Sequence, residues 1–189
     1  MNGRPGRIRI IGGSLRNSRL EVPEQPGLRP TPERVRETLF NWLAPMIEGA
    51  RVLDLCAGTG ALGIEALSRG AAGACFVEPD ARAAQALRDN LARLKAAGGE
   101  VAALDAQGFL RGTERPFDLV FLDPPFALDL WGALAQRLEQ AGWLAERAWI
   151  YLESPRGVTP AVPANWSLHR EGGAGEVRFA LYRRALPLS

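Results

Sequence analysis

The chain has few of the residues that build disulfide frameworks or metal sites. Its 189 residues include two cysteines, Cys56 and Cys75, and a single histidine, His169. Two cysteines are too few for a disulfide framework, and with one histidine they fall short of a zinc ligand set. We therefore expect no metal-centred chemistry.

Two kinds of segment are also missing from the sequence. It contains no run of eighteen or more apolar residues, which excludes a typical membrane-spanning helix, and it shows no signal-peptide pattern. With 47% apolar and 23% charged residues, the composition is that of an ordinary globular protein, and the length suits one main domain. We expect a cytoplasmic monomer with no membrane partner.

Charge is unevenly distributed along the chain, although the net charge is only +2. Residues 1–20 carry five arginines and no acid, which leaves −3 for the rest. A basic segment on a slightly acidic body favours a polyanionic partner; the alternative is a solvated tail. Arginine and isoleucine alternate over residues 7–10, and Gly12-Gly13 follows. We therefore predict a β-hairpin with a basic face from residue 7 to about residue 22.

Beyond residue 30, predicted strands and helices alternate. Thr31 and Pro32 suit the cap and first position of a helix, and Arg34 and Arg36 lie off its apolar stripe. Strands are expected at residues 51–56, 74–77, 101–104, 117–122, 148–152, 167–170 and 176–182, and further helices at 62–68, 80–95 and 128–140. This order predicts an α/β fold with a doubly wound, mostly parallel sheet and an antiparallel C-terminal edge hairpin. Residues 1–30 would form a basic N-terminal arm and residues 31–189 the main domain.

A glycine-rich turn follows the first strand of the predicted sheet. Gly58, Gly60 and Gly63 satisfy the pattern G-x-G-x-x-G, and Glu78 ends the next strand twenty residues after Gly58. Read literally, this is a dinucleotide-binding fingerprint in which the acid binds ribose hydroxyl groups. Asp54 favours S-adenosylmethionine instead, because a carboxylate suits its sulfonium and ammonium groups and would repel a pyrophosphate. The simpler alternative is a turn with a helix-capping aspartate.

Asp105 ends the third predicted strand, and with Ala106 it could receive an adenine amine. The carboxyl ends of parallel strands are where such ligands bind.

Asp123-Pro124-Pro125-Phe126 follows the apolar strand at residues 117–122. Proline cannot donate to a strand ladder, so this turn lies beyond the paired region with its carbonyl groups free. Asp123 and the Pro124 carbonyl could each accept one hydrogen of a substrate amine, and Phe126 could stack on a base flipped out of its helix. A structural cis-proline turn is the alternative.

These segments together resemble the bacterial 16S rRNA (guanine(966)-N2)-methyltransferase family. The resemblance is carried by residues 53–71, 7–20, 29–43 and 123–126, in the same order along nearly the whole chain. Two positions depart from the family pattern: Cys56 stands where an aromatic residue is expected, and Pro79 stands where a basic residue is common. The resemblance implies a Rossmann-like fold, S-adenosylmethionine as cofactor, and methylation of a guanine N2 amine in 16S ribosomal RNA, free or within the small ribosomal subunit.

Residues and resemblance together indicate three sets of site residues. The catalytic turn comprises Asp123, Pro124, Pro125 and Phe126. The cofactor pocket comprises Asp54, Ala57, Gly58, Thr59, Gly60, Glu78, Pro79, Asp105 and Ala106, to which the resemblance adds Thr31 and Asn41. The RNA contacts comprise Arg4, Arg7, Arg9, Arg16, Arg19, Arg29, Arg34 and Arg36.

Three other functions stay open at this point. An amino-methyltransferase acting on adenine, cytosine or protein glutamine uses a similar turn, usually with asparagine first and tyrosine last. An NAD-dependent oxidoreductase is favoured only by the literal glycine pattern. A non-catalytic RNA-binding module would keep the arm without needing a cofactor site.

Overall fold

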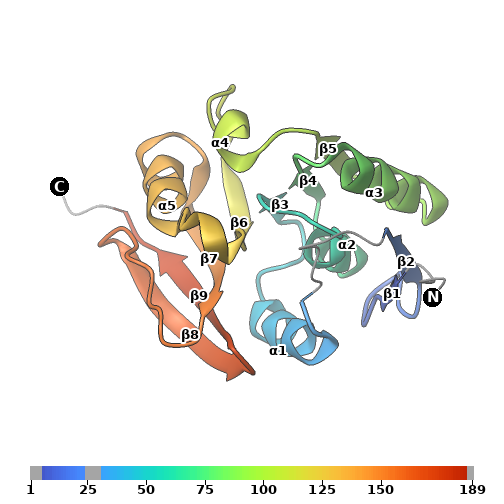
Figure 1. Cartoon of the computed structure of the whole chain (residues 1–189), viewed down its shortest axis with the longest axis horizontal. Coiled ribbons are helices and arrows are strands. Elements are labelled where there is room, and N and C mark those ends of the chain that lie inside the picture. Colours follow the sequence, from blue (N-terminus) through green and yellow to red (C-terminus); the bar gives the residue numbers. More distant parts are fainter. Residues whose placement is uncertain (1–5, 24–30, 187–189) are drawn as a thin grey trace.

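The computed structural model describes residues 6–23 and 31–186, and its centre is a seven-stranded sheet. The strands follow the order β5-β4-β3-β6-β7-β9-β8 (Figure 1). All neighbours are parallel except β7 with β9 and β8 with β9. The strands are β3 (Arg51–Asp54), β4 (Gly73–Val77), β5 (Gly99–Ala102), β6 (Phe117–Leu122), β7 (Leu144–Pro155), β8 (Trp166–Ala174) and β9 (Val177–Arg184). The predicted mostly parallel sheet with an antiparallel edge is confirmed.

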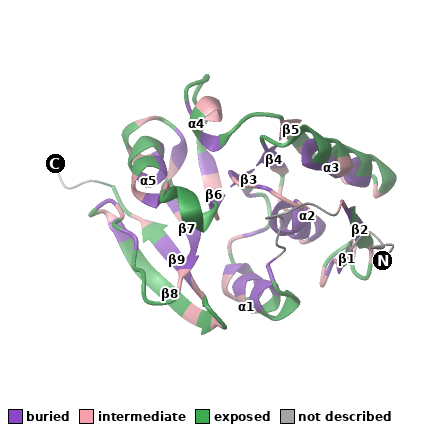
Figure 2. Cartoon of the chain, in the orientation of Figure 1, coloured by how far each residue is buried: buried purple, intermediate pink, exposed green. Residues whose placement is uncertain are grey.

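Helices cover both faces of this sheet. They are α1 (Glu33–Leu43), α2 (Ala61–Ser68), α3 (Ala81–Arg93), α4 (Ala106–Phe109), the 3₁₀ turn η1 (Phe126–Leu128) and α5 (Trp131–Gln140). One core joins α1, α2 and α3 to the sheet, and a second joins α4 and α5 to the other face. The sheet-facing sides of the helices are buried and their outer sides exposed (Figure 2).

The N-terminal segment forms the predicted hairpin, with β1 (Gly6–Arg9) antiparallel to β2 (Arg19–Val22). Its apolar residues Ile8, Ile10, Leu20 and Val22 are buried in the same core as α1–α3. The hairpin is therefore packed onto the main domain and lies beside α3 and α2 (Figure 1). Arg4 and Arg29, two of the predicted RNA contacts, lie outside the described residues.

Several expected bounds differ from the structure by a few residues, such as that of β3, which ends at Asp54 rather than at residue 56. Three other differences concern β5, β7 and the cap of α1. The third strand, expected at 101–104, is β5 at Gly99–Ala102, because Asp105 begins the short helix α4. β7 runs well past the expected 148–152, because it pairs with β9 as far as Pro155. Pro32 rather than Thr31 caps α1, without a side-chain hydrogen bond.

None of the described helices is both long and apolar enough to cross a membrane.

Candidate active site

Four acidic side chains gather at the carboxyl ends of neighbouring strands. Asp54 ends β3, Glu78 follows β4, Asp123 follows β6, and Glu153 lies near the end of β7. Parallel strands present their carboxyl ends at one edge of a sheet, which brings acids far apart in sequence together. The mutual repulsion of Asp54 with Glu78, Glu153 and Asp123 shows that they form one cluster, which we call the acid edge.

Asp54 is the most deeply buried acid of this edge. Its Oδ2 accepts the backbone N–H of Gly63 at 3.1 Å, yet burial dominates and raises the pKa of Asp54 to about 7. Burial also raises the pKa of Glu78, although the backbone N–H groups of Gly58 and Asp80 donate to it and partly offset that effect. Both groups therefore carry negative charge at an energetic cost that a bound cation would reduce.

The predicted glycine turn leads from β3 into α2. Gly58 and Gly60 adopt left-handed conformations, with φ of +53° and +80°. A Cβ on Gly60 would lie 2.3 Å from a methyl carbon of Leu87, so no side chain fits there. The Thr59 hydroxyl accepts the N–H of Ala61 at 3.2 Å and so helps to begin α2. The glycine turn therefore places bare backbone beside Asp54.

Glu153 is the acid that sequence reasoning missed. Its side chain is buried, and its Oε1 accepts hydrogen bonds from Tyr151 Oη at 2.6 Å and Thr31 Oγ1 at 3.0 Å. It is also hydrogen-bonded to the Asp123 side chain. The sequence carries a signal for it, because Glu153 directly follows the predicted strand 148–152 just as Glu78, Asp105 and Asp123 directly follow theirs.

The Asp123-Pro124-Pro125-Phe126 turn begins directly after β6, as predicted. Burial, followed by the charge and hydrogen bond of Glu153, holds the pKa of Asp123 well above its usual range. The Pro125 carbonyl accepts the N–H of Leu128 at 3.1 Å, whereas the Pro124 carbonyl accepts no hydrogen bond within the described part of the chain. No described peptide bond is cis, so the turn does not depend on a cis-proline.

Phe126 presents a partly open aromatic ring next to this turn. Its side chain is 38% exposed, and its ring packs against buried Trp131 with centroids 5.6 Å apart. Trp131 is itself held by a 2.7 Å hydrogen bond from Nε1 to the Glu153 carbonyl. The ring is therefore supported on one side and accessible on the other.

The acid edge lacks a positive partner in the described structure. None of the ion pairs formed within residues 6–23 and 31–186 includes Asp54, Glu78, Asp123 or Glu153. Nor do His, Cys, Asp and Glu side chains in these ranges converge in a way that could hold a metal ion. A ligand with organic cationic groups fits this donor set, because it would neutralise the buried carboxylates.

Cys56 lies among these acids without being a nucleophile. Burial raises the pKa of its thiol, and the negative charges of Asp123, Asp54 and Glu78 raise it further. Only the thiolate form attacks, so the side chain acts here as a small packing residue. Cys75 is buried in β4, where burial raises its pKa to about 11.

The other predicted pocket residues are placed differently. Asp105 is exposed and caps α4 by accepting a hydrogen bond from the N–H of Gly108 at 2.6 Å. Ala106 is the first residue of α4 and is buried. Thr31 reaches the acid edge through Glu153, whereas Asn41 is exposed. The predicted cofactor contact of Asn41 therefore stays a prediction.

The hairpin is attached to α2 through polar contacts. Buried Glu65 accepts the backbone N–H groups of Ile11 at 2.8 Å and Gly12 at 3.2 Å. The Ser68 hydroxyl donates to the Gly12 carbonyl at 2.5 Å and accepts the N–H of Leu15 at 2.9 Å. These contacts hold the hairpin in one orientation, with its basic face outward.

The predicted RNA contact of Arg36 is wrong. Only 2% of this residue is exposed; its guanidinium donates to the carbonyl groups of Arg9 at 2.9 Å and Thr31 at 3.3 Å, and lies 3.6 Å from Glu65. Arg36 therefore joins the hairpin to the main domain and cannot face a phosphate group. Arg9 is half-buried and engaged by Glu33 and Asn17.

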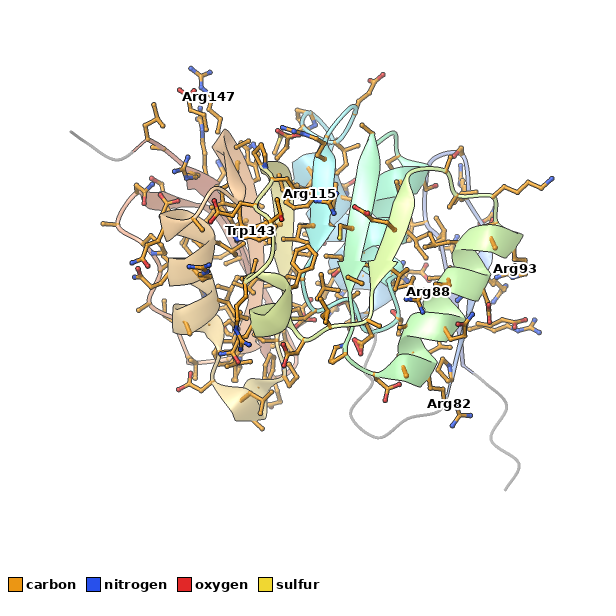
Figure 3. The ribbon with its side chains drawn as sticks, turned by 90° about the horizontal axis from the view of Figure 1, so that it is seen from above. Arg82, Arg88, Arg93, Arg115, Trp143 and Arg147 are labelled. Carbon is orange, nitrogen blue, oxygen red and sulfur yellow. The ribbon has the colours of Figure 1, made fainter. Side chains whose placement is uncertain are left out.

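The other arginines of the predicted set that the structure describes face solvent. They are Arg7, Arg16 and Arg19 on the hairpin and Arg34 on α1. Sequence reasoning missed that α3 adds three exposed arginines beside the hairpin, Arg82, Arg88 and Arg93 (Figure 3). Arg93 donates to the Arg19 carbonyl at 2.5 Å, so the two elements form one basic surface.

A surface hollow of about 560 Å³ lies at the other end of β7, lined by residues such as Arg147, His169 and Arg183. Figure 3 shows Arg147 at the end of the sheet opposite to Arg82, which begins α3 next to the acid edge. This hollow is thus remote from the four acids, and the chemistry of the side chains places the candidate active site at the acid edge.

Comparison with known proteins identifies the family of the chain. The family model described as conserved hypothetical protein 95 matches residues 8–183. Ribosomal RNA small subunit methyltransferase D of Escherichia coli K12 is 54% identical over 180 residues, covering 95% of this chain and 91% of that protein. The protein of that name from Haemophilus influenzae is 42% identical, covering 94% of each chain. The solved structure of E. coli yhhF superposes with a TM-score of 0.89 at 51% identity, covering 95% of this chain and 99% of that chain.

Proposed function

The chain belongs to the conserved hypothetical protein 95 family, and from this premise we propose that it methylates small-subunit ribosomal RNA with S-adenosylmethionine as methyl donor. We further propose that the acceptor is the exocyclic N2 amine of a guanine, with guanine 966 of 16S rRNA as the expected position. The relatives' names support the ribosomal RNA substrate. The observation that carries the chemistry is the acid edge, where buried carboxylates meet an amine-accepting turn.

The residues of the acid edge fit S-adenosylmethionine. Asp54 would face its cationic groups, and the glycine turn would let it approach the backbone closely. Glu78 accepts two backbone hydrogen bonds and has further oxygen lone pairs, which would accept hydrogen bonds from the ribose hydroxyl groups. Asp105 and Ala106 at the start of α4 would border the adenine. When bound, the cofactor supplies an electrophilic methyl group and retains the C–S bonding electrons on its sulfur as the methyl leaves.

The turn after β6 would hold the acceptor amine. The lone pair of an exocyclic guanine amine is delocalised into the ring, which makes it a weak nucleophile. Hydrogen bonds to Asp123 and to the Pro124 carbonyl would favour a tetrahedral nitrogen and aim its lone pair. Much of the rate then comes from positioning. Phe126, supported by Trp131, would stack on the flipped base.

The basic surface would position the RNA. Exposed arginines on the hairpin and α3 suit phosphate groups, which orient a nucleic acid without reading its sequence. Because α3 begins directly after Glu78 and Asp80, this surface adjoins the acid edge. RNA bound along it would present a flipped base to the turn after β6.

Methyl transfer from labelled S-adenosylmethionine to rRNA of a strain lacking this enzyme tests the proposal. We expect N2-methylguanosine after digestion to nucleosides, and parallel assays with free 16S rRNA and small subunits show which is the substrate. Asp123→Ala should bind S-adenosylhomocysteine and lose most turnover, whereas Asp89→Ala, an exposed change on α3, serves as control. Another methylated nucleoside would refute the guanine N2 assignment, and stabilisation by NAD instead of S-adenosylhomocysteine in a thermal shift would refute the cofactor.

A further inference from the structure

Asp123 directly follows Leu122 and Glu153 directly follows Leu152, and these two leucines pair in parallel register across β6 and β7. The two acids are therefore neighbours; Glu153 is buried, and a side-chain hydrogen bond joins it to Asp123. Two ionised carboxylates are acceptors only, so a hydrogen bond between them requires one proton. Without that proton, two negative charges would face each other with little solvent to screen them. The pair is therefore held together by a proton, as in other carboxyl pairs that share a site.

The surroundings indicate which partner donates the shared proton. Tyr151 and Thr31 both direct hydroxyl donors at Glu153 Oε1, at 2.6 Å and 3.0 Å. Glu153 is thus the hydrogen-bond acceptor towards its other neighbours. Asp123 accordingly keeps the proton and donates it to Glu153, which agrees with the direction of its own pKa.

The titratable groups around the pair are acids, a thiol and a tyrosine hydroxyl, and none of them brings positive charge. Asp54 and Cys56 face it from the end of β3, Tyr151 from β7, and Glu78 acts on Asp54 from the end of β4. No described arginine, lysine or histidine forms an ion pair with Asp123 or Glu153. The neighbourhood therefore favours keeping the shared proton.

Building on the proposed function, we propose that Glu153 is a positioning residue that holds Asp123 through one shared proton. One oxygen of Asp123 is then tied to Glu153, and the other is presented in a fixed direction to the substrate amine. Asp123 in this arrangement orients the amine and does not act as a base. The proton that the methylated nitrogen must lose, once the N–C bond has formed and the C–S bond has broken, passes to solvent.

Infrared spectroscopy of the cofactor-free protein tests the shared proton without any activity. Asp54→Asn is used as the background, so that Asp54 contributes no band. We expect the carbonyl stretching band of a protonated carboxyl group at neutral pH, and its loss on adding Asp123→Asn or Glu153→Gln. Glu146→Gln, an exposed change on the same strand, should leave the band unchanged. A band that survives Glu153→Gln would overturn the proposal.

Single-turnover methyl transfer tests the positioning role. In Glu153→Gln, the new amide oxygen can accept hydrogen bonds from Tyr151 and Thr31, and the amide N–H can donate one to Asp123. We therefore expect a rate within about threefold of the wild type. Glu153→Ala removes the support, and we expect the rate to fall about 10- to 100-fold while the Kd of S-adenosylhomocysteine changes little. Wild-type turnover by Glu153→Ala would overturn the proposal.

The pH profile separates this role from a merely structural one. The wild-type rate should decline at alkaline pH as the pair loses its shared proton, and Glu153→Gln should lack this decline because its N–H does not ionise. If Glu153→Ala does not fold, the infrared comparison and the pH profile of Glu153→Gln decide the question. If the wild type itself fails to methylate RNA, the proposed function is refuted, while the infrared result still reports on the pair.

Discussion

Replacing Asp54 by asparagine should make the cofactor-free protein more stable at alkaline pH while removing its affinity for S-adenosylmethionine. Asp54 is fully buried at the end of β3, and burial raises its pKa from 3.8 to about 7. The unfolded chain ionises at the ordinary pKa. Above pH 7, the ionised carboxylate therefore costs the folded state about 4 kcal/mol.

The direction of the pH dependence follows from which state binds the Asp54 proton more tightly. The folded protein binds it more tightly than the unfolded chain, because the pKa of Asp54 is higher in the folded state. The contribution of Asp54 to the free energy of unfolding is therefore greatest below about pH 4. It falls as the pH rises towards 7 and stays constant above that pH. Asparagine carries no charge, and its carbonyl can accept the same N–H from Gly63. Its amide N–H₂ needs new partners at a cost of about 1–3 kcal/mol, which leaves a net gain of about 1–3 kcal/mol at about pH 8.

Urea denaturation at about pH 5 and about pH 8 measures this difference, and calorimetry with S-adenosylhomocysteine measures the lost affinity. Asp89→Asn, an exposed change on α3 at a side chain that accepts a hydrogen bond from Gln85, should have the same small effect at both pH values. If Asp54→Asn changed stability equally at both pH values, its charge would not be what burial penalises. The reasoning on the acid edge would then fail.

Three further results are expected. Gly13→Ala should destabilise the protein by several kcal/mol in urea denaturation, because its Cβ would lie 2.0 Å from the Ser68 carbonyl oxygen; Gly49→Ala has a similar φ but open space and should lose only about 1 kcal/mol. Cys56→Ala should keep methyl transfer within about threefold, and the native thiol should resist alkylation at neutral pH. Neutralising the hairpin residues Arg7, Arg16 and Arg19 should weaken RNA binding and flatten its salt dependence in filter-binding assays. Neutralising three exposed arginines outside the hairpin and α3, namely Arg111, Arg147 and Arg170, should not.

The acid edge could be anticipated from the sequence because a parallel sheet follows a simple rule. Acids that end strands meet at one edge whatever their separation in the chain, so Asp54, Glu78 and Asp123 were placed without knowing any contact. Glu153 obeys the same rule, because it directly follows the predicted strand at residues 148–152. The antiparallel C-terminal hairpin was equally accessible, since glycines separate two strand-like segments.

Arg36 and Thr31 could not be placed in the same way. From neighbouring residues alone, Arg36 is predicted to lie outside the apolar face of its helix and to be exposed. Thr31 is predicted to cap the same helix. Their actual partners are distant in sequence: the Arg9 carbonyl and Glu65 for Arg36, and Glu153 for Thr31. A buried arginine is tolerated only where such partners converge, and no local periodicity reveals that convergence.

These same contacts connect the basic surface to the Asp123-Pro124-Pro125-Phe126 turn. Arg36 bonds to the carbonyl groups of Arg9 in the hairpin and of Thr31 at the start of α1, and the Thr31 hydroxyl bonds to Glu153. Glu153 in turn holds the side chain of Asp123. The hairpin that would grip RNA and the carboxyl that would orient the base are thus fixed to one another through consecutive hydrogen bonds. A flipped guanine would therefore meet Asp123 at a position set by where the phosphate backbone is held, which is what a reaction governed by positioning requires.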